Sequence, residues 1–153
     1  MKHSNITPEN ITNLSRDSIF VFGSSLRGDH KGGAARIATE RFGAIPGIGA
    51  GLQGQSYAIP STEGLDTLRL YIDQFIAVSL IMDYCKFYVT RIGCGNAGYT
   101  DEQVAPLFIK AFGRKNIYLP ESFVRIIKEV KAKNYDEEMS GMVFGFKNNG
   151  TSL

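Results

Sequence analysis

The chain has 153 residues, of which 43% are hydrophobic and 21% charged, and its formal net charge is +2. This length suits one domain, and a nearly neutral chain without a Lys/Arg run gives no electrostatic sign of nucleic-acid or membrane binding. The longest apolar segment, residues 75–82, is too short to span a bilayer, and residues 1–5 lack the apolar core of a signal peptide.

The cysteine content is also low. Cys85 and Cys94 are too few for a disulfide framework, and no metal-ligand spacing is present. We therefore expect a soluble cytoplasmic protein that forms a single domain over residues 1–153, with no metal and no cofactor.

The first strong element follows a polar lead-in, residues 1–18, that holds at most a short edge strand or turn. Residues 19–22 are all apolar, which predicts a central strand buried on both faces. A loop over residues 24–33 then leads into a predicted helix over 34–42. Its apolar face is expected to contain Ala34, Ile37, Ala38 and Phe42.

The middle of the chain begins with a loop, residues 43–54, that contains five glycines and little charge. Residues 56–59 predict a short strand closed by Pro60. A helix is predicted over about 65–83. Its second half is apolar nearly all round, so we expect it to be deeply buried; its apolar positions at helical spacing are Leu68, Tyr71, Ile72, Phe75 and Ile76.

A second strand–glycine loop–helix unit follows. Residues 87–92 form an apolar strand pattern, residues 93–98 contain three glycines, and a helix is predicted over 101–112. Thr100 with Gln103 predicts a capping box, and Tyr99 with Val104 predicts a hydrophobic staple. Pro106 lies beyond the first turn, where it should bend the helix or remove a hydrogen bond.

The last predicted strand covers residues 116–119, and Pro120 opens a final helix. Its apolar face contains Phe123, Ile126, Ile127 and Val130. Residues 134–153 lose this pattern. We expect residues 142–144 to add an edge strand and the last residues to fray.

Alternating strands and helices predict an α/β fold with three layers and a mixed, mostly parallel sheet. Ligands of such sheets bind at the carboxyl ends of the strands, where both glycine loops should lie. Glycine lets backbone amides approach an anion closely, and two such loops at one edge indicate a diphosphate-containing ligand. The alternative is that both loops are tight connections that bind nothing.

These residues resemble a known family, the macro domain. The resemblance depends on residues 91–95 (Arg-Ile-Gly-Cys-Gly) followed by a helix, on residues 31–35 and 41–43, and on residues 24–28. It covers roughly residues 17–130. Among the family's branches, the one that contains the terminal ADP-ribose–protein glycohydrolase is the most similar, and bacteriophage forms of the domain, some of them ADP-ribose-1''-phosphate phosphatases, resemble the chain more closely still.

The resemblance implies a three-layer fold whose cleft binds ADP-ribose. The second loop would wrap the diphosphate, Tyr99 would pack on a ribose or the base, and the first loop would surround the distal ribose. The partner would be an ADP-ribose derivative or an ADP-ribosylated macromolecule. The implied ligand-binding residues are Ser24, Ser25, Leu26, Gly28, Gly32, Gly33 and Ala34 in the first loop, and Gly93, Cys94, Gly95, Asn96, Ala97, Gly98 and Tyr99 in the second.

The chain departs from the family at its catalytic positions. Ala97 stands where the glycohydrolase branch has a catalytic Asp, and residues 61–63 (Ser-Thr-Glu) stand near the position of its Lys. Gly33 or Ala35 stands where another hydrolytic branch has an Asp. The acid that usually holds adenine has no assignable counterpart, because the N-terminal strand is short; Asp17 is a weak stand-in. Binding therefore carries over better than catalysis.

Asp29 and His30 are the candidates for chemistry in the first loop. A carboxylate or imidazole there could activate a water on C1'' or on a 1''-phosphate, and His is suited to proton transfer near neutral pH. The alternative is a solvated turn. Cys94 could be a nucleophile, but a small buried residue is the stronger interpretation because no His is near it in sequence.

Four more polar residues have two interpretations each. Asn96 could bind a ribose hydroxyl or supply a turn conformation. Arg91 could reach a phosphate or pair with an acid. Ser24 and Ser25 could donate hydrogen bonds to the ligand or cap the turn.

Three functions follow from these observations. The first is a hydrolase that acts on an ADP-ribose derivative, and the second is a non-catalytic module that binds such a nucleotide. The third is a Rossmann-like nucleotide hydrolase of the lysine-decarboxylase-like group, suggested by residues 21–25. This third function ranks last because the Pro-Gly-Gly motif of that group is missing.

Overall fold

The computed structural model describes the backbone of residues 4–151 and the side chains of residues 4–142. Its centre is a six-stranded sheet with the order β1-β6-β5-β2-β4-β3. Neighbouring strands are parallel except for β3, which pairs antiparallel with β4 at one edge. The strands are β1 (Asn5–Ile6), β2 (Ser18–Ser24), β3 (Gly51–Gln53), β4 (Ser56–Pro60), β5 (Lys86–Val89) and β6 (Ile117–Leu119).

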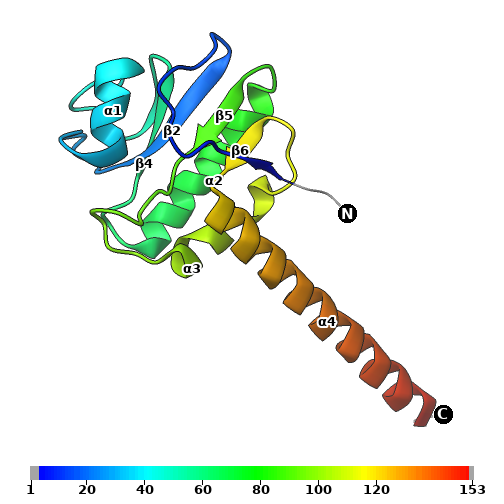
Figure 1. Ribbon diagram of the computed structural model, residues 1–153. Coiled ribbons are helices and arrows are strands. Elements are labelled where there is room, and N and C mark those ends of the chain that lie inside the picture. Colours follow the sequence, from blue (N-terminus) through cyan, green and yellow to red (C-terminus); the bar gives the residue numbers. More distant parts are fainter. Residues whose placement is uncertain (1–3, 152–153) are drawn as a thin grey trace.

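Helices cover both faces of this sheet, so the fold has three layers (Figure 1). One face carries α1, and the other carries α2, η1 and the beginning of α4. The mixed, mostly parallel α/β sheet is therefore confirmed. The helices are α1 (Gly33–Arg41), α2 (Leu65–Ile81), α3 (Asp101–Val104), the 3-10 helix η1 (Ala105–Ala111) and α4 (Glu121–Thr151).

Strand β2 is the middle of the core, as its apolar run predicted. Ile19 and Val21 point into the larger cluster, which α2, η1 and α4 complete. Phe20 and Phe22 point to the opposite face, into a smaller cluster with α1. Because successive strand residues alternate between faces, a fully apolar strand is what a sheet covered on both sides requires.

Two predictions about helix burial are wrong. Ile37 is exposed, and the face of α1 that packs on the sheet contains Ala35 and Ala38. The second half of α2 is not buried all round, since Ile81 is 79% exposed and Leu80 is exposed as well. The reason is that α2 belongs to the outer layer. Only the side that faces the sheet is buried, with Leu68, Ile72, Phe75, Ile76 and Ser79.

Three boundaries differ from the predictions. The glycine-rich loop contains a strand, β3, which gains its extended form by pairing with β4. The strand predicted over 87–92 ends at Val89. The N–H and Oγ1 of Thr90 still donate to the carbonyl of Val21, and beyond it the amide of Ile92 donates back to the carbonyl of Thr90 in a tight turn. The helix predicted over 101–112 changes from α to 3-10 geometry around Pro106, which has no amide hydrogen to donate.

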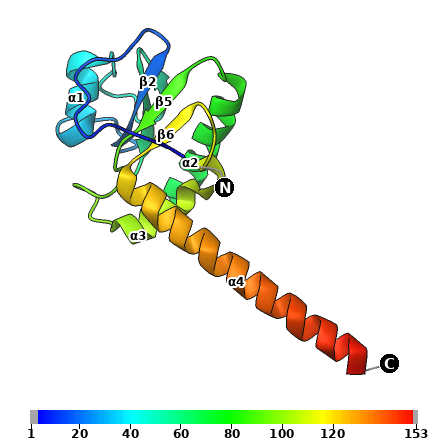
Figure 2. The same ribbon diagram turned by 45° about the vertical axis from the view of Figure 1, so that its right-hand side comes forward.

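The edge strand predicted at residues 142–144 is also wrong. Helix α4 continues through this segment to Thr151 and projects away from the body of the domain (Figures 1 and 2). Once the first turns are anchored by burial, adding further helical residues no longer carries the cost of nucleation. In residues 4–151 no helix combines the length and the apolar character needed to cross a membrane.

Candidate functional site

The two glycine loops meet at the carboxyl ends of the parallel strands, which we call the carboxyl edge of the sheet. Strands β2 and β5 are parallel neighbours, so the chain leaves both of them at the same end. A Cβ added to Gly32 in the first loop would lie 3.4 Å from Nδ2 of Asn96 in the second. The connection after β4 reaches the same place, since Ser61 Oγ would lie 3.0 Å from a Cβ added to Gly23. The juxtaposition on which the predicted site depends is therefore present.

The second loop offers backbone donors without acceptors. Within residues 4–142, the amides of Gly93, Gly95, Asn96 and Ala97 form no hydrogen bond. Gly93 and Gly98 have φ angles of 79° and 80°, which shape a turn that residues with side chains rarely adopt. A run of amides free of partners in a tight turn is a common way to hold an anion.

The start of α3 is already satisfied within the chain. Thr100 Oγ1 accepts from the amide of Gln103 at 3.2 Å, and Gln103 Oε1 accepts from the amide of Thr100 at 2.9 Å, so the predicted capping box is confirmed. The predicted staple pairs Tyr99 with Val104, and an atom of each side chain lies within 3.3 Å of a Cβ added to Gly93. An anion at this edge would therefore bind the turn amides and not the first turn of α3.

Arg91 pairs with an acid, which was one of its two interpretations. Its Nη2 and Nε donate to the two carboxylate oxygens of Asp101 at 2.6 and 3.2 Å. The guanidinium holds the pKa of Asp101 at about 2. This bidentate pair ties the end of β5 to α3 and so fixes both ends of the glycine turn.

Cys94 is not an activated nucleophile. Burial, followed by the neighbouring Asp101 carboxylate, raises the pKa of its thiol to about 12. The thiolate is the reactive form of cysteine, so a thiol with this pKa is inert at neutral pH. The geometry favours the interpretation of Cys94 as a small, partly buried packing residue.

The two serines of the first loop stabilise the loop itself. Ser24 Oγ donates to the carbonyl of Gly49, and Ser25 Oγ accepts from the amide of Gly28 at 3.2 Å. A Cβ on Gly28 would lie 2.6 Å from the backbone of Ile48. Gly28 is therefore needed for the close crossing of two backbone segments, and its own amide is occupied.

The beginning of α1 is more open. Gly32 occupies the N-cap position without a side-chain hydrogen bond, and no acid lies in the first turn. Gly33 starts the helix with a φ of 59°. The uncapped amides of this turn are part of the same edge as Asn96.

Asp29 and His30 have different environments although they are adjacent. Asp29 is exposed, as a solvated turn requires. His30 is only 7% exposed, has a φ of 51°, and packs edge-on against Phe22 with ring centroids 5.1 Å apart. The solvated-turn interpretation is thus wrong for His30.

Gln53 on β3 holds the imidazole in place. Its Oε1 lies 3.2 Å from Nε2 of His30 and accepts from the amide of Ile45 at 2.7 Å, while its Nε2 donates to the carbonyls of Ile48 and Gly51. Because Oε1 can only accept, Nε2 of His30 carries the hydrogen. Nδ1 of His30 is buried without a partner.

Sequence reasoning did not identify Gln53. The signal that could have found it is a long polar side chain within a glycine-rich segment that has almost no charge. Glu63, near the position of the Lys of the glycohydrolase branch, also has a structural role. Its Oε1 accepts from the amide of Leu26 at 3.3 Å, so the connection after β4 also supports the first loop.

Asp17 lies at the amino ends of the strands, away from the carboxyl edge. It precedes β2, and its carbonyl accepts from the amide of Lys86 at the start of β5. Asp17 therefore lies away from the glycine loops, which follow the other ends of these strands.

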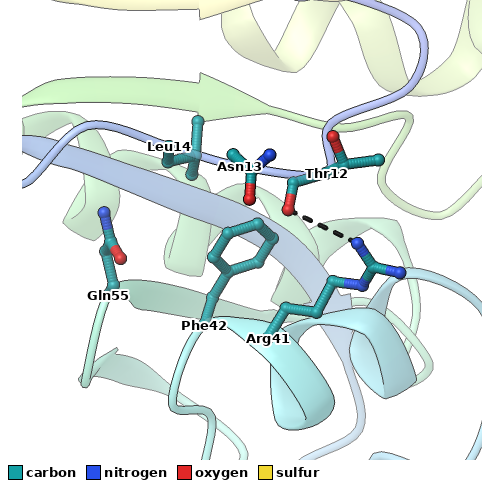
Figure 3. A pocket seen from close by; sticks show the side chains of 6 residues that line it. All are labelled: Thr12, Asn13, Leu14, Arg41, Phe42 and Gln55. Carbon is teal, nitrogen blue, oxygen red and sulfur yellow. Dashed lines mark hydrogen bonds between the residues drawn. The ribbon is translucent and has the colours of Figure 1, made fainter.

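A cavity of about 370 Å³ also lies near the amino ends of the strands (Figure 3). It separates the N-terminal segment from the end of α1, and Arg41 donates across it to the carbonyl of Thr12 at 3.4 Å. Its lining consists of Thr12, Asn13, Leu14, Arg41, Phe42 and Gln55. None of these residues belongs to the glycine loops.

The carboxyl edge thus combines free backbone amides, glycines without steric bulk and an exposed carboxylate at Asp29. Comparisons of the chain with protein-family models, with curated proteins and with solved structures found no match. Within the described residues no three His, Cys, Asp or Glu side chains gather in a way that could hold a metal ion. A function is therefore inferred from the chemistry of the two loops.

Proposed function

We propose that the chain binds ADP-ribose or an ADP-ribose derivative at the carboxyl edge of the sheet. The observation that supports this proposal is the set of free amides at Gly93, Gly95, Asn96 and Ala97, in a loop whose Asn96 side chain lies beside Gly32 of the first loop. A diphosphate needs several donors within a short span, and backbone amides provide them without bulky side chains. The macro-domain resemblance of residues 91–95 supplies the identity of the ligand.

The parts of the ligand follow from this assignment. The diphosphate binds the turn at residues 93–98. The distal ribose lies beside Gly32 and the Asn96 side chain, so that the side-chain carboxamide of Asn96 can reach a ribose hydroxyl. The open first turn of α1 provides further donors beside the same group.

Calorimetric titration with ADP-ribose tests the proposal. We expect a micromolar dissociation constant, or about 8 kcal/mol. Gly95→Leu is the sharpest variant because Gly95 has no positive φ and no atom within 4 Å of an added Cβ, so the fold tolerates the side chain while the ligand does not. We expect it to weaken binding by at least about tenfold, which is 1.4 kcal/mol.

Gly141→Leu is the matched control. Gly141 lies on the exposed part of α4, and a Cβ there also contacts nothing, so ADP-ribose binding should equal that of the wild type. The proposal is refuted when the wild-type chain shows no binding at millimolar ADP-ribose. Equal binding by the Gly95→Leu variant would show that the ligand lies elsewhere.

Hydrolysis of the bound derivative is the second candidate function, and the exposed Asp29 carboxylate favours it. In this reaction Asp29 takes a proton from a water that attacks C1'' or the 1''-phosphate, and the bond to the leaving group breaks. Cys94, with a pKa of about 12, and Ala97, with no acid, take no part.

Incubation with ADP-ribose-1''-phosphate and with an ADP-ribosylated protein separates an enzyme from a binding module. Asp29→Asn should abolish release of phosphate or of ADP-ribose while leaving the affinity for ADP-ribose within about twofold, and a loss of about 10²–10⁴ in rate is usual for a general base. His30→Ala tests whether the imidazole contributes. Binding without turnover on either substrate would identify a non-catalytic module.

A further inference from the structure

We propose that two copies of the chain associate through the projecting part of α4, in antiparallel orientation. The first turns of this helix are fixed to the domain by Phe123, Val124, Ile126 and Ile127, which are buried. From residue 131 to residue 142 every residue is exposed, and the helix extends into solvent beyond the domain (Figures 1 and 2). This proposal is independent of the ligand proposed above.

The projecting helix has an apolar stripe along one side. Ala132, Tyr135, Met139 and Met142 follow one another at intervals of three, four and three residues. Tyr135, Met139 and Met142 are 62%, 43% and 67% exposed. Alternating intervals of three and four place apolar residues at the contact positions of a pair of supercoiled helices. A single helix in water gains nothing from such a stripe, whereas a second helix would cover it.

The charges of the helix select the partner and its direction. Residues 125–133 contain Arg125, Lys128, Lys131 and Lys133 with one acid, Glu129, which gives four positive and one negative charge, or +3. Residues 134–142 contain three acids, Asp136, Glu137 and Glu138, and no base, which gives −3. A second copy in antiparallel orientation sets each positive segment against a negative one, and a parallel copy sets like charges together.

We take the register in which Ala132 of one copy packs against Tyr135 of the other. Met139 then lies opposite Lys128 of the second copy and Met142 opposite Arg125, so the aliphatic stems of these two cations cover the methionines. Lys131 then lies near Glu138 of the second copy, and the two-fold axis repeats this attractive pair. The same register brings Glu129 near Asp136 of the second copy, which is a repulsive pair. Glu129→Lys should therefore strengthen an antiparallel dimer, and it would add a like charge to the positive segment of a parallel one.

Sedimentation equilibrium of the full chain over a range of concentrations tests the proposal. The apparent mass of the wild type should rise with concentration from 16.8 kDa towards twice this value. Met139→Lys should raise the dimer dissociation constant by at least about tenfold, because it replaces an apolar contact with a cation that lies opposite Lys128 of the second copy. Ser140→Lys is the matched control, because Ser140 lies on a different side of the same helical turn. Its dimer dissociation constant should stay within about twofold of the wild-type value.

Three results would overturn the proposal. One is a wild-type chain that remains at the monomer mass up to millimolar concentration. Another is a Met139→Lys variant that dimerises as well as Ser140→Lys, which would place the contact off the stripe. The third is a Glu129→Lys variant whose dimer is no tighter than that of the wild type, which would exclude the antiparallel arrangement. These substitutions lie on exposed helix, so they leave the folded domain unchanged.

Discussion

Replacing Gln53 with leucine should destabilise the domain and loosen both segments that Gln53 connects. The side chain is buried and forms four hydrogen bonds, with the amide of Ile45, the imidazole of His30 and the carbonyls of Ile48 and Gly51. Leucine keeps the approximate volume and removes every one of these bonds. The substitution thus tests polar contacts with little change in packing.

The size of the effect depends on which partners can reach water after the change. Ile45 and Ile48 are exposed residues, so water can replace part of the lost bonding of their backbone groups. His30 is buried, and its Nδ1 already has no partner, so the variant leaves both ring nitrogens unsatisfied. Leaving a buried polar group unpaired costs about 1–3 kcal/mol, and with the weaker bonds we expect a loss of about 2–4 kcal/mol.

Urea denaturation followed by circular dichroism measures this loss. Gln55→Leu is the matched control, because Gln55 lies two residues away and donates a single bond to the carbonyl of Ser15. It should lower the free energy of unfolding by no more than about 1 kcal/mol. Equal effects for the two variants, or a loss below about 0.5 kcal/mol for Gln53→Leu, would refute the role given to Gln53.

Three further predictions concern stability and reactivity. Asp101→Asn should lower the free energy of unfolding at pH 7 by about 1 kcal/mol. The loss is small because the Arg91 side chain is 60% exposed and water screens the ion pair. The pKa of Asp101 falls from about 3.9 in the unfolded chain to about 2 in the folded one. The stabilisation is therefore complete above pH 4 and disappears as the pH falls towards 2, and acid titrations of both proteins should converge there. Cys94, whose pKa is about 12, should resist iodoacetamide at pH 8 until the chain unfolds, and rapid native-state labelling of this residue by mass spectrometry would contradict its protonated state. Leu68→Ala should cost about 2–5 kcal/mol in thermal or chemical unfolding, because Leu68 is fully buried. Leu70→Ala, on the outer side of α2, should change the free energy of unfolding by no more than about 0.5 kcal/mol. Similar losses for Leu68→Ala and Leu70→Ala would show that α2 is covered on both sides.

Local patterns predicted most of the elements. The apolar run before Gly23, the capping box at Thr100 and the apolar face after Pro120 each specify structure through neighbouring residues, and each is confirmed. Strand β3 could not be found this way. Its residues Gly51–Gln53 have no strand pattern of their own and become extended by pairing with β4.

Burial was harder to predict than helix formation. The second half of α2 is apolar on nearly every side, and no local rule says which side faces the sheet. The end of α4 failed for the opposite reason. From residue 131 to residue 142 every residue is exposed, and the few apolar residues there form a stripe too sparse to mark a helix that packs against a core.

The site was predictable in position and less so in detail. Parallel strands followed by glycine loops place both loops at one edge, and Gly32 beside Asn96 agrees with this. The sequence does not separate a glycine that leaves space for a ligand from one that lets two backbone segments cross. Gly28 is of the second kind. The burial of His30 depends on Gln53, a contact between distant residues that no local pattern encodes.

The strand order has a consequence for how any bound molecule acts on the domain. Ile19 is paired with Phe87 across the middle of the sheet, so the two loops exist side by side only while residues far apart in the chain remain joined. A molecule held between them therefore resists the unfolding of the whole domain and not of one loop. At a hundred times its dissociation constant it would add about 2.7 kcal/mol to the free energy of unfolding, so a rise in melting temperature would report its capture directly.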